Sequence, residues 1–408
     1  MMSTQRSALS TRGIRYSELA FVELASSKSV RDINRDAVLA IIRSQQPVAR
    51  ADLARASGLH ASTVSAIVKQ LINEKWVKEG TIARRPLGRY PRLLSLNDEL
   101  VILAADVNSK QATIALLDLN GRFLALEVVP LVSEPEDAIG KIVLCMESMR
   151  ANHPRRSFQG IGISMPGRID PESQRLLQAP KLKWDSFDIA GAIKKRMRLQ
   201  VELTIAANAC LLAEQWSGKL DGIRNAVLIM VSEGIGAAIL ANGQIITNRN
   251  GLAGGFGHYP IDPKGPLCGC GQRGCWEVFA SSNAALLYYA EMRPKDAAHT
   301  IHELLRMTEE ENRVAIAAVS RQATYLGRGL RFVTAALSPE VILIAGDITA
   351  SWARFGPVIQ AELGDTMLAG HAPQLETAND DELARLRGAA AVVLQRQSGF
   401  LRSTWKGN

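Results

Sequence analysis

Apolar residues between positions 29 and 72 repeat at helical spacing, and two interruptions divide them into three predicted helices. The first helix begins at Ser29 and ends before Pro47, because proline disfavours helical backbone in the residue before it. The second helix runs from Arg50 to Gly58, a residue suited to the left-handed conformation that ends many helices. The third helix covers Leu59–Ile72, and its apolar side chains fall on one face.

Two helices joined by a tight turn that contains glycine form the helix-turn-helix arrangement, whose second helix enters the major groove of DNA. The exposed face of the third predicted helix carries hydroxyl and basic side chains suited to bases and phosphates: Ser62, Thr63, Ser65 and Lys69. Each helix alone would also fit an ordinary surface helix. The ordered set of helix, helix, glycine turn and hydroxyl-rich helix is what favours DNA binding.

Two short strands, at 76–79 and 92–96, follow the third helix and predict a β-hairpin, the wing. Arg89 lies in the turn of this hairpin, where it is placed to enter a minor groove. We therefore predict a winged helix-turn-helix domain over residues 29–97, preceded by a flexible tail over residues 1–28.

Charge is concentrated in the same part of the chain. Residues 1–97 contain 16 Lys and Arg against 7 Asp and Glu, whereas the remaining residues contain 32 against 33. Basic clusters commonly bind nucleic acid, because each neutralised phosphate releases counterions. No apolar run approaches the roughly 18 residues of a membrane helix, and the N-terminus lacks the apolar stretch of a signal peptide. We therefore expect a cytoplasmic protein with no membrane partner.

Strands and helices alternate after Asn97, which predicts an α/β body. Its apolar runs predict strands at 101–106, 111–118, 123–129, 160–164, 226–231, 236–240 and 341–345. A hairpin early in the body is followed by a similar strand pair near the middle of the chain. This repetition predicts two similar lobes with a cleft between them.

Three segments of the body carry a more specific pattern, namely Gly160–Asp170, Gly254–His258 and Cys268–Glu277. Together they resemble the ROK family, named for repressors, open reading frames and kinases. The resemblance extends from Ser29 to the C-terminus, because regulatory members carry a winged helix before the body. It implies an actin-like, ribonuclease H-like ATPase fold over 98–408, with lobes at about 98–205 and 206–408 and a sugar in the cleft.

A cluster of potential metal ligands has the spacing H-x9-C-x-C-x4-C, formed by His258, Cys268, Cys270 and Cys275. One imidazole and three thiolates complete the tetrahedral shell of a structural Zn2+. Buried free thiols or a redox switch are the alternatives from the residues alone. The resemblance implies zinc, because these four residues match the zinc ligands of the family one for one.

The parts that a sugar kinase of the family needs are altered in this chain. Its two phosphate-binding turns correspond to Asp106–Lys110 and Ser232–Gly236, in which Asn108 replaces a glycine and Glu233 a threonine. The catalytic aspartate of the family's Asp-Ala-Asn motif is absent from Ala206–Asn208. Because these parts are lost together, we expect no enzymatic activity.

The sugar-binding positions of the family are mostly replaced as well. Lys181, residues 205–206 and Gly255 stand where the family has polar sugar ligands, and only His258 and Glu277 match it. We take Lys181, His258 and Glu277 as candidate effector-binding residues. Lys181 would favour an anionic or modified sugar; alternatively it is a solvated lysine, Glu277 braces the zinc loop, and no small effector exists.

The sequence thus predicts a DNA-binding transcription regulator, a repressor of sugar-related genes, with a zinc-stabilised ROK body that lacks kinase machinery. One winged helix reads few bases, so we expect a homodimer or homotetramer on a pseudo-palindromic, double-stranded operator. The alternatives are a ROK-type sugar kinase and a degenerate kinase that acts as a protein-interaction module.

Overall fold

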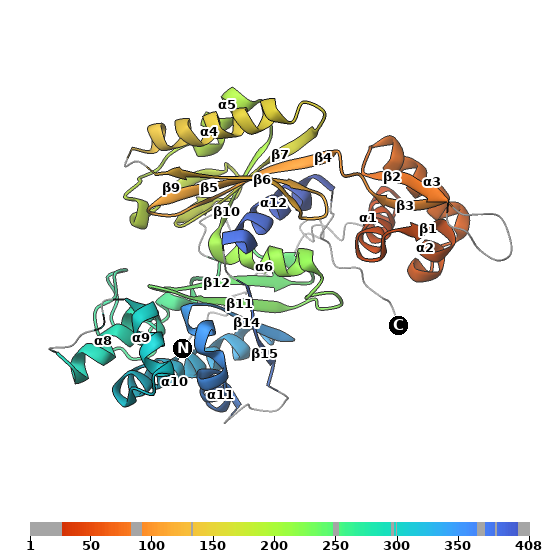
Figure 1. Ribbon diagram of the computed structural model, residues 1–408. Helices are drawn as coiled ribbons and strands as arrows, with labels where there is room; N and C mark the ends of the chain where they lie inside the picture. The colour runs from red at the N-terminus through yellow and green to blue at the C-terminus, as the bar shows by residue number, and fades with distance from the viewer. Residues whose placement is uncertain are drawn as a thin grey trace, which may run out of the picture.

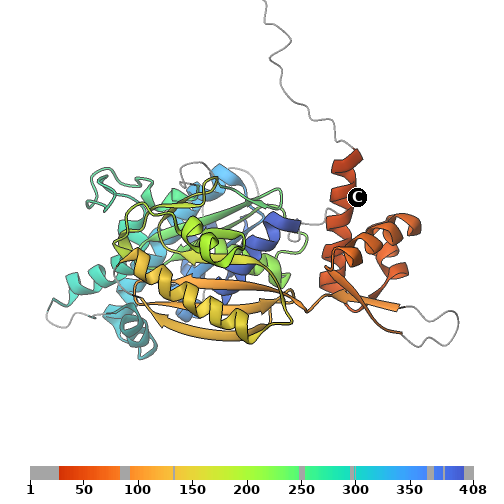
Figure 2. The same cartoon turned by 90° about the horizontal axis from the view of Figure 1, so that it is seen from above.

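A small N-terminal unit and a larger body of two sheets make up the chain (Figure 1). The computed structural model describes residues 27–82, 92–131, 134–247, 253–294, 298, 300–364, 372–379 and 382–398. Figure 2 shows the N-terminal unit to one side of the body, which it joins at the start of the first body strand.

The N-terminal unit packs three helices against a sheet with the strand order β1-β3-β2. These elements are α1 (Ser27–Gln45), β1 (Val48–Ala49), α2 (Arg50–Ser57), α3 (Ala61–Asn73), β2 (Val77–Ile82) and β3 (Arg92–Leu96). The three predicted helices and the two strands of the hairpin are confirmed. Gly58 ends α2 with φ +68°, the left-handed conformation expected of it. The sequence did not reveal β1, because two residues are too short to show a period.

The body contains two five-stranded sheets of the same topology. The first has the order β10 (Val201–Ile205), β7 (Ser157–Met165), β4 (Leu100–Val107), β5 (Gln111–Asp118) and β6 (Phe123–Pro130). The second has the order β13 (Gln244–Ile245), β12 (Ile235–Ala241), β11 (Ala226–Val231), β14 (Val341–Gly346) and β15 (Gln374–Thr377). In each sheet three antiparallel strands are followed by two that run parallel to the first. The predicted α/β body with a repeated hairpin is therefore confirmed.

Helices cover both sheets and fill the space between them (Figure 1). The outer face of the first sheet carries α4 (Pro135–Asn152) and α5 (Ile189–Met197). Between the two sheets lie α6 (Ala206–Ser217) and α12 (Glu382–Ser398). The outer side of the second sheet carries α7 (Glu277–Ala280), α8 (Ser282–Met292), α9 (Ile301–Glu309), α10 (Arg313–Leu337) and α11 (Trp352–Gly364).

Short elements complete the body. They are the hairpin β8 (Arg168–Asp170) and β9 (Arg175–Gln178) and the 3-10 turns η2 (Pro180–Leu182), η3 (Gly255–His258) and η4 (Asp347–Ser351). None of the helices in the described part of the chain is long and apolar enough to cross a membrane. The limits proposed for the winged helix and the two lobes stay predictions. The C-terminal helix α12 packs against the first sheet, although it follows the second sheet in sequence.

Candidate nucleic-acid interface and metal centre

Helix α3 presents the polar side chains that the sequence singled out. Its apolar residues are buried in the N-terminal unit, so Ser62, Ser65 and Lys69 are exposed and Thr63 is half-buried. His60 precedes the helix as its N-cap, and its Nδ1 lies 2.8 Å from Ser62 Oγ. No signal in the sequence marked His60, because histidine is not among the preferred N-cap residues.

Helix α1 adds a second group of residues beside α3. Arg31 and Asn34 line a surface hollow together with Ser62 and Thr63, and Arg31 Nη2 donates to Gln70 Oε1 at 3.2 Å. The guanidinium therefore brings a positive charge to the surface next to the polar residues of α3. No signal in the sequence marked Arg31, because the apolar spacing that predicts α1 says nothing about its exposed face.

The predicted wing is held to the helices by Glu79 of β2. Its carboxylate accepts hydrogen bonds from Arg50 at 2.5 Å and from Arg92 at 3.0 Å, which join the start of α2 to both strands. These hydrogen bonds hold the pKa of the Glu79 carboxyl below its usual value. The turn of the wing, with the predicted minor-groove residue Arg89, lies outside the described residues.

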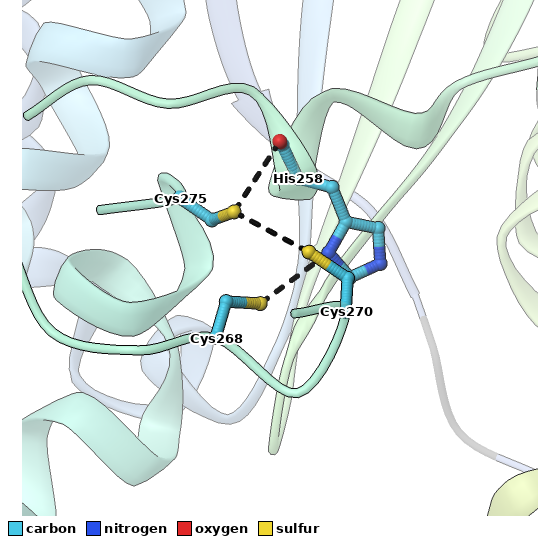
Figure 3. Close-up of side chains that lie close together, drawn as sticks. All are labelled: His258, Cys268, Cys270 and Cys275. Carbon is cyan, nitrogen blue, oxygen red and sulfur yellow. Dashed lines mark hydrogen bonds between the residues drawn. The ribbon is translucent and has the colours of Figure 1, made fainter. Parts of the chain in front are cut away.

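The four predicted metal ligands converge at one point (Figure 3). His258 closes η3, and Cys268, Cys270 and Cys275 come from the loop that leads to α7. One ligand atom from each residue lies within 4.8 Å of all the others. The Cys268 Sγ to His258 Nδ1 and Cys270 Sγ to Cys275 Sγ distances are both 3.6 Å. Tetrahedral zinc with these ligands has ligand separations of about 3.5–3.8 Å, so the donor set and these two distances fit the ion.

The backbone of the cysteine loop is tightly folded, as its glycines suggested. Gly274 has φ +67°, and a Cβ atom there would lie 1.5 Å from the carbonyl oxygen of Asp262. Only glycine therefore fits next to Cys275. The loop is therefore tightly turned directly before Cys275.

Glu277 points into the same cluster. Its Oε1 lies 2.9 Å from Cys268 Sγ and 3.2 Å from His258 Nδ1. The hydrogen bond to Glu277 raises the pKa of His258. Burial raises the pKa of the Cys268 and Cys275 thiols, whereas a backbone hydrogen bond from Gln272 lowers that of Cys270. Buried thiols that resist ionisation need a cation to become thiolate ligands.

A family model for the ROK family matches residues 102–396. The chain belongs to the ROK family. Over 334 residues it is 27% identical to the xylose repressor of Bacillus subtilis (strain 168), and the match covers 81% of this chain and 86% of that protein. Over 347 residues it is 26% identical to the DNA-binding transcriptional dual regulator NagC of Escherichia coli (strain K12), with 81% and 84% covered.

Solved structures of the ROK family agree with the fold. A ROK family transcriptional regulator, a homolog of the E. coli MLC protein, superposes with a TM-score of 0.78 at 25% identity over 91% of this chain and 98% of that one. A ROK family glucokinase from Streptomyces griseus, in complex with glucose and AMPPNP, superposes with a TM-score of 0.61 at 23% identity over 72% and 99%. The latter shows likeness of fold alone. The predicted family and fold class are confirmed.

An ion pair connects η2 in the first half of this ROK body with the β11–β12 turn in the second half. Lys181 Nζ of η2 lies 2.9 Å from Glu233 Oε2, which belongs to the turn between β11 and β12. The charge of Lys181 is thus balanced by the carboxylate that the sequence placed in a phosphate-binding turn. Of the three predicted effector residues, the structure brings His258 and Glu277 together at the metal cluster and places Lys181 in this ion pair. Their role in effector binding stays a prediction.

Proposed function

We propose that this ROK protein is a DNA-binding transcription repressor that responds to a sugar or sugar derivative. The observation that carries the proposal is the α2-turn-α3 unit, which buries one face of α3 and exposes Ser62, Ser65 and Lys69 on the other. The excess of basic residues lies in the same part of the chain. The names of two relatives, a xylose repressor and a dual regulator, support this proposal.

Phosphoryl transfer is not part of the proposed function. The general base that the reaction needs is replaced at Ala206, and the phosphate-binding turn carries Glu233, whose charge would repel a triphosphate. The Asp106 carboxylate is engaged by Arg385 at 2.9 Å. Incubation with ATP, Mg2+ and a panel of hexoses should therefore give no turnover above a control without protein.

The metal cluster has a structural role in this proposal. His258, Cys268, Cys270 and Cys275 would fill all four positions of a tetrahedral Zn2+, which leaves no open position for catalysis. The ion would fix the loop between η3 and α7, and Glu277 would brace His258 and Cys268 from outside the ligand set.

Operator recognition requires two copies of the winged helix, because one recognition helix contacts few base pairs. We propose a homodimer or homotetramer whose symmetry matches a pseudo-palindromic operator. Genome-wide mapping of bound fragments, followed by fluorescence anisotropy on the recovered duplexes at physiological salt, tests the function directly. Failure to bind any recovered fragment more tightly than random duplex would contradict it.

A further inference from the structure

A cavity of about 280 Å³ lies beside the first two turns of α6. Its wall combines the β8–β9 hairpin and β10, which belong to the first half of the body, with β13 and residues 246–247 and 253 from the second half. A molecule bound there would therefore contact both halves. Lys181, His258 and Glu277 do not line this cavity, so it is a different place from the predicted effector-binding residues.

The described part of the cavity wall carries polar side chains but no charged ones. Asn208, Gln244, Thr247 and Gln395 line it with amide and hydroxyl groups. None of its described lining residues is Asp, Glu, Lys, Arg or His. Gln174 and Thr204 also line it, and apolar side chains such as Leu212 form the rest of the described wall. Amide and hydroxyl groups beside an apolar surface suit a neutral ligand that has hydroxyl or amide groups of its own.

Helix α6 lines the cavity near its N-terminal end. At its C-terminal end it is hydrogen-bonded to the N-terminal unit. Arg43, in the last turn of α1, donates through Nη1 to the carbonyl oxygens of Gln215 at 3.3 Å and Trp216 at 3.1 Å. Its Nη2 lies 3.6 Å from Asp221 Oδ1, and its side chain is only 12% exposed. The guanidinium thus holds the carbonyl end of α6, where its positive charge is favourable.

Apolar contacts reinforce this connection. Leu212 lines the cavity and also belongs to the apolar cluster that contains Trp216 and, from α1, Leu39 and Ile42. From Asn208 to Trp216 the helix spans about 12 Å at 1.5 Å per residue. A shift of α6 on ligand binding would therefore displace α1 as well, because closely packed side chains transmit displacement.

We propose that this cavity binds an uncharged, hydroxyl-bearing ligand of the sugar class, and that α6 transmits its binding to the winged helix through Arg43. The inference rests on the proposed repressor function and names the ligand class and the connection that it would use. This requires α6 to have two positions relative to the winged helix. The ligand changes operator affinity only to the extent that its affinity differs between these two positions.

Ligand binding is tested by calorimetry on the full chain with neutral pentoses, hexoses and N-acetylhexosamines, and with hexose 6-phosphates and uronic acids as charged probes. We expect heat from at least one neutral sugar and none from the charged probes. Asn208→Leu should weaken that binding roughly ten-fold, since it removes hydrogen-bonding groups at nearly constant size. Asn152→Leu, on the exposed end of α4, is the matched control and should leave it unchanged. Silence of every neutral sugar, or equal affinity in Asn208→Leu, would overturn the cavity as the site.

Transmission is tested by measuring operator affinity with and without the bound sugar. We expect the sugar to change the operator affinity of the unaltered protein on the order of ten-fold, and Arg43→Met to abolish this change while sugar affinity stays within about two-fold. Arg43→Lys keeps a positive charge but not the planar group that reaches both carbonyl oxygens, so it should lose most of the sugar-dependent change in operator affinity. This second variant keeps the test valid if Arg43→Met does not fold. Arg306→Met, on the exposed side of α9, is the control.

An equal sugar effect in Arg43→Met and the unaltered protein would overturn the transmission step. Operator binding without sugar is recorded in every titration. If the unaltered protein did not bind the operator even without sugar, the repressor function itself would be contradicted. If it bound the operator but no sugar changed the affinity, only this inference would be contradicted.

Discussion

Arg385 of α12 donates through Nε to Oδ2 of Asp106 at the end of β4, at a distance of 2.9 Å. The Asp106 side chain is 3% exposed and that of Arg385 is 23% exposed. The pair joins the C-terminal helix to the central strands of the first sheet. It also engages the carboxylate that opens the first phosphate-binding turn in kinases of this fold.

Removing the cationic partner of Asp106 should destabilise the body. Arg385→Met is expected to lower the free energy of unfolding by roughly 2–3 kcal/mol, because a buried carboxylate loses a charged hydrogen bond. This is below the loss for a fully buried pair, since Arg385 is partly exposed. Urea unfolding followed by circular dichroism measures the change. Arg306→Met, on an exposed helix face, should stay within about 0.5 kcal/mol, and an equal loss in both variants would contradict the assigned role.

Lys69 should contribute to DNA affinity through phosphate contact. Lys69→Ala is expected to weaken binding to operator and to random duplex alike, and to reduce the slope of log affinity against log salt by about one. Fluorescence anisotropy at several salt concentrations gives both values. Lys195→Ala, exposed on α5, serves as the control. An unchanged salt slope in Lys69→Ala would show that this lysine does not meet a phosphate.

Ser62 should contribute to DNA affinity in a different way from Lys69. Its hydroxyl group lies near the start of the recognition helix and would contact a base or a DNA phosphate without adding a charge. Ser62→Ala is expected to weaken operator binding by roughly 1 kcal/mol and to leave the salt slope unchanged. Competition between operator and random duplex shows whether sequence preference is lost as well. Full retention of operator affinity would remove Ser62 from the proposed interface.

The purified protein should contain one zinc ion per chain. Cys270→Ser removes one of four ligands, so we expect its metal content and thermal midpoint to fall together, because metal binding stabilises the folded loop. Elemental analysis and thermal unfolding report the two effects. Cys145→Ser changes a thiol outside the cluster and should keep the metal. Stoichiometric zinc in Cys270→Ser, with an unchanged midpoint, would argue against the assigned ligand set.

Acid should loosen the N-terminal unit partly through Glu79. Its pKa is lower in the folded chain than in the unfolded one, so its stabilising effect is present above the ordinary value near 4.5 and is lost as the pH falls through the folded value. Both arginine partners are partly exposed, so we expect a contribution below about 1 kcal/mol. Glu79→Gln should therefore lower stability at pH 7 but have little effect near pH 3. Urea unfolding at both values, with Glu309→Gln as a control, measures the difference.

Local patterns in the sequence determined much of this protein. The periodicity around Val64 and Leu71 predicted α3, and Gly58 predicted its turn, because both depend on residues close together in the chain. The spacing of His258 and the three cysteines predicted the metal cluster for the same reason, since three of its ligands lie within one short loop. The family followed from motifs of similar length.

Only the tertiary structure decided which distant residues meet. Arg43 is hydrogen-bonded to the end of α6, about 170 residues away in the sequence. Lys181 forms an ion pair with Glu233, and Arg385 forms one with Asp106. The cavity beside Asn208 likewise draws its wall from five separate segments. Sequence periodicity shows which face of an element is buried, but it does not show which partner covers that face. The partner depends on how the two sheets and the N-terminal unit pack, and packing is set by the whole chain.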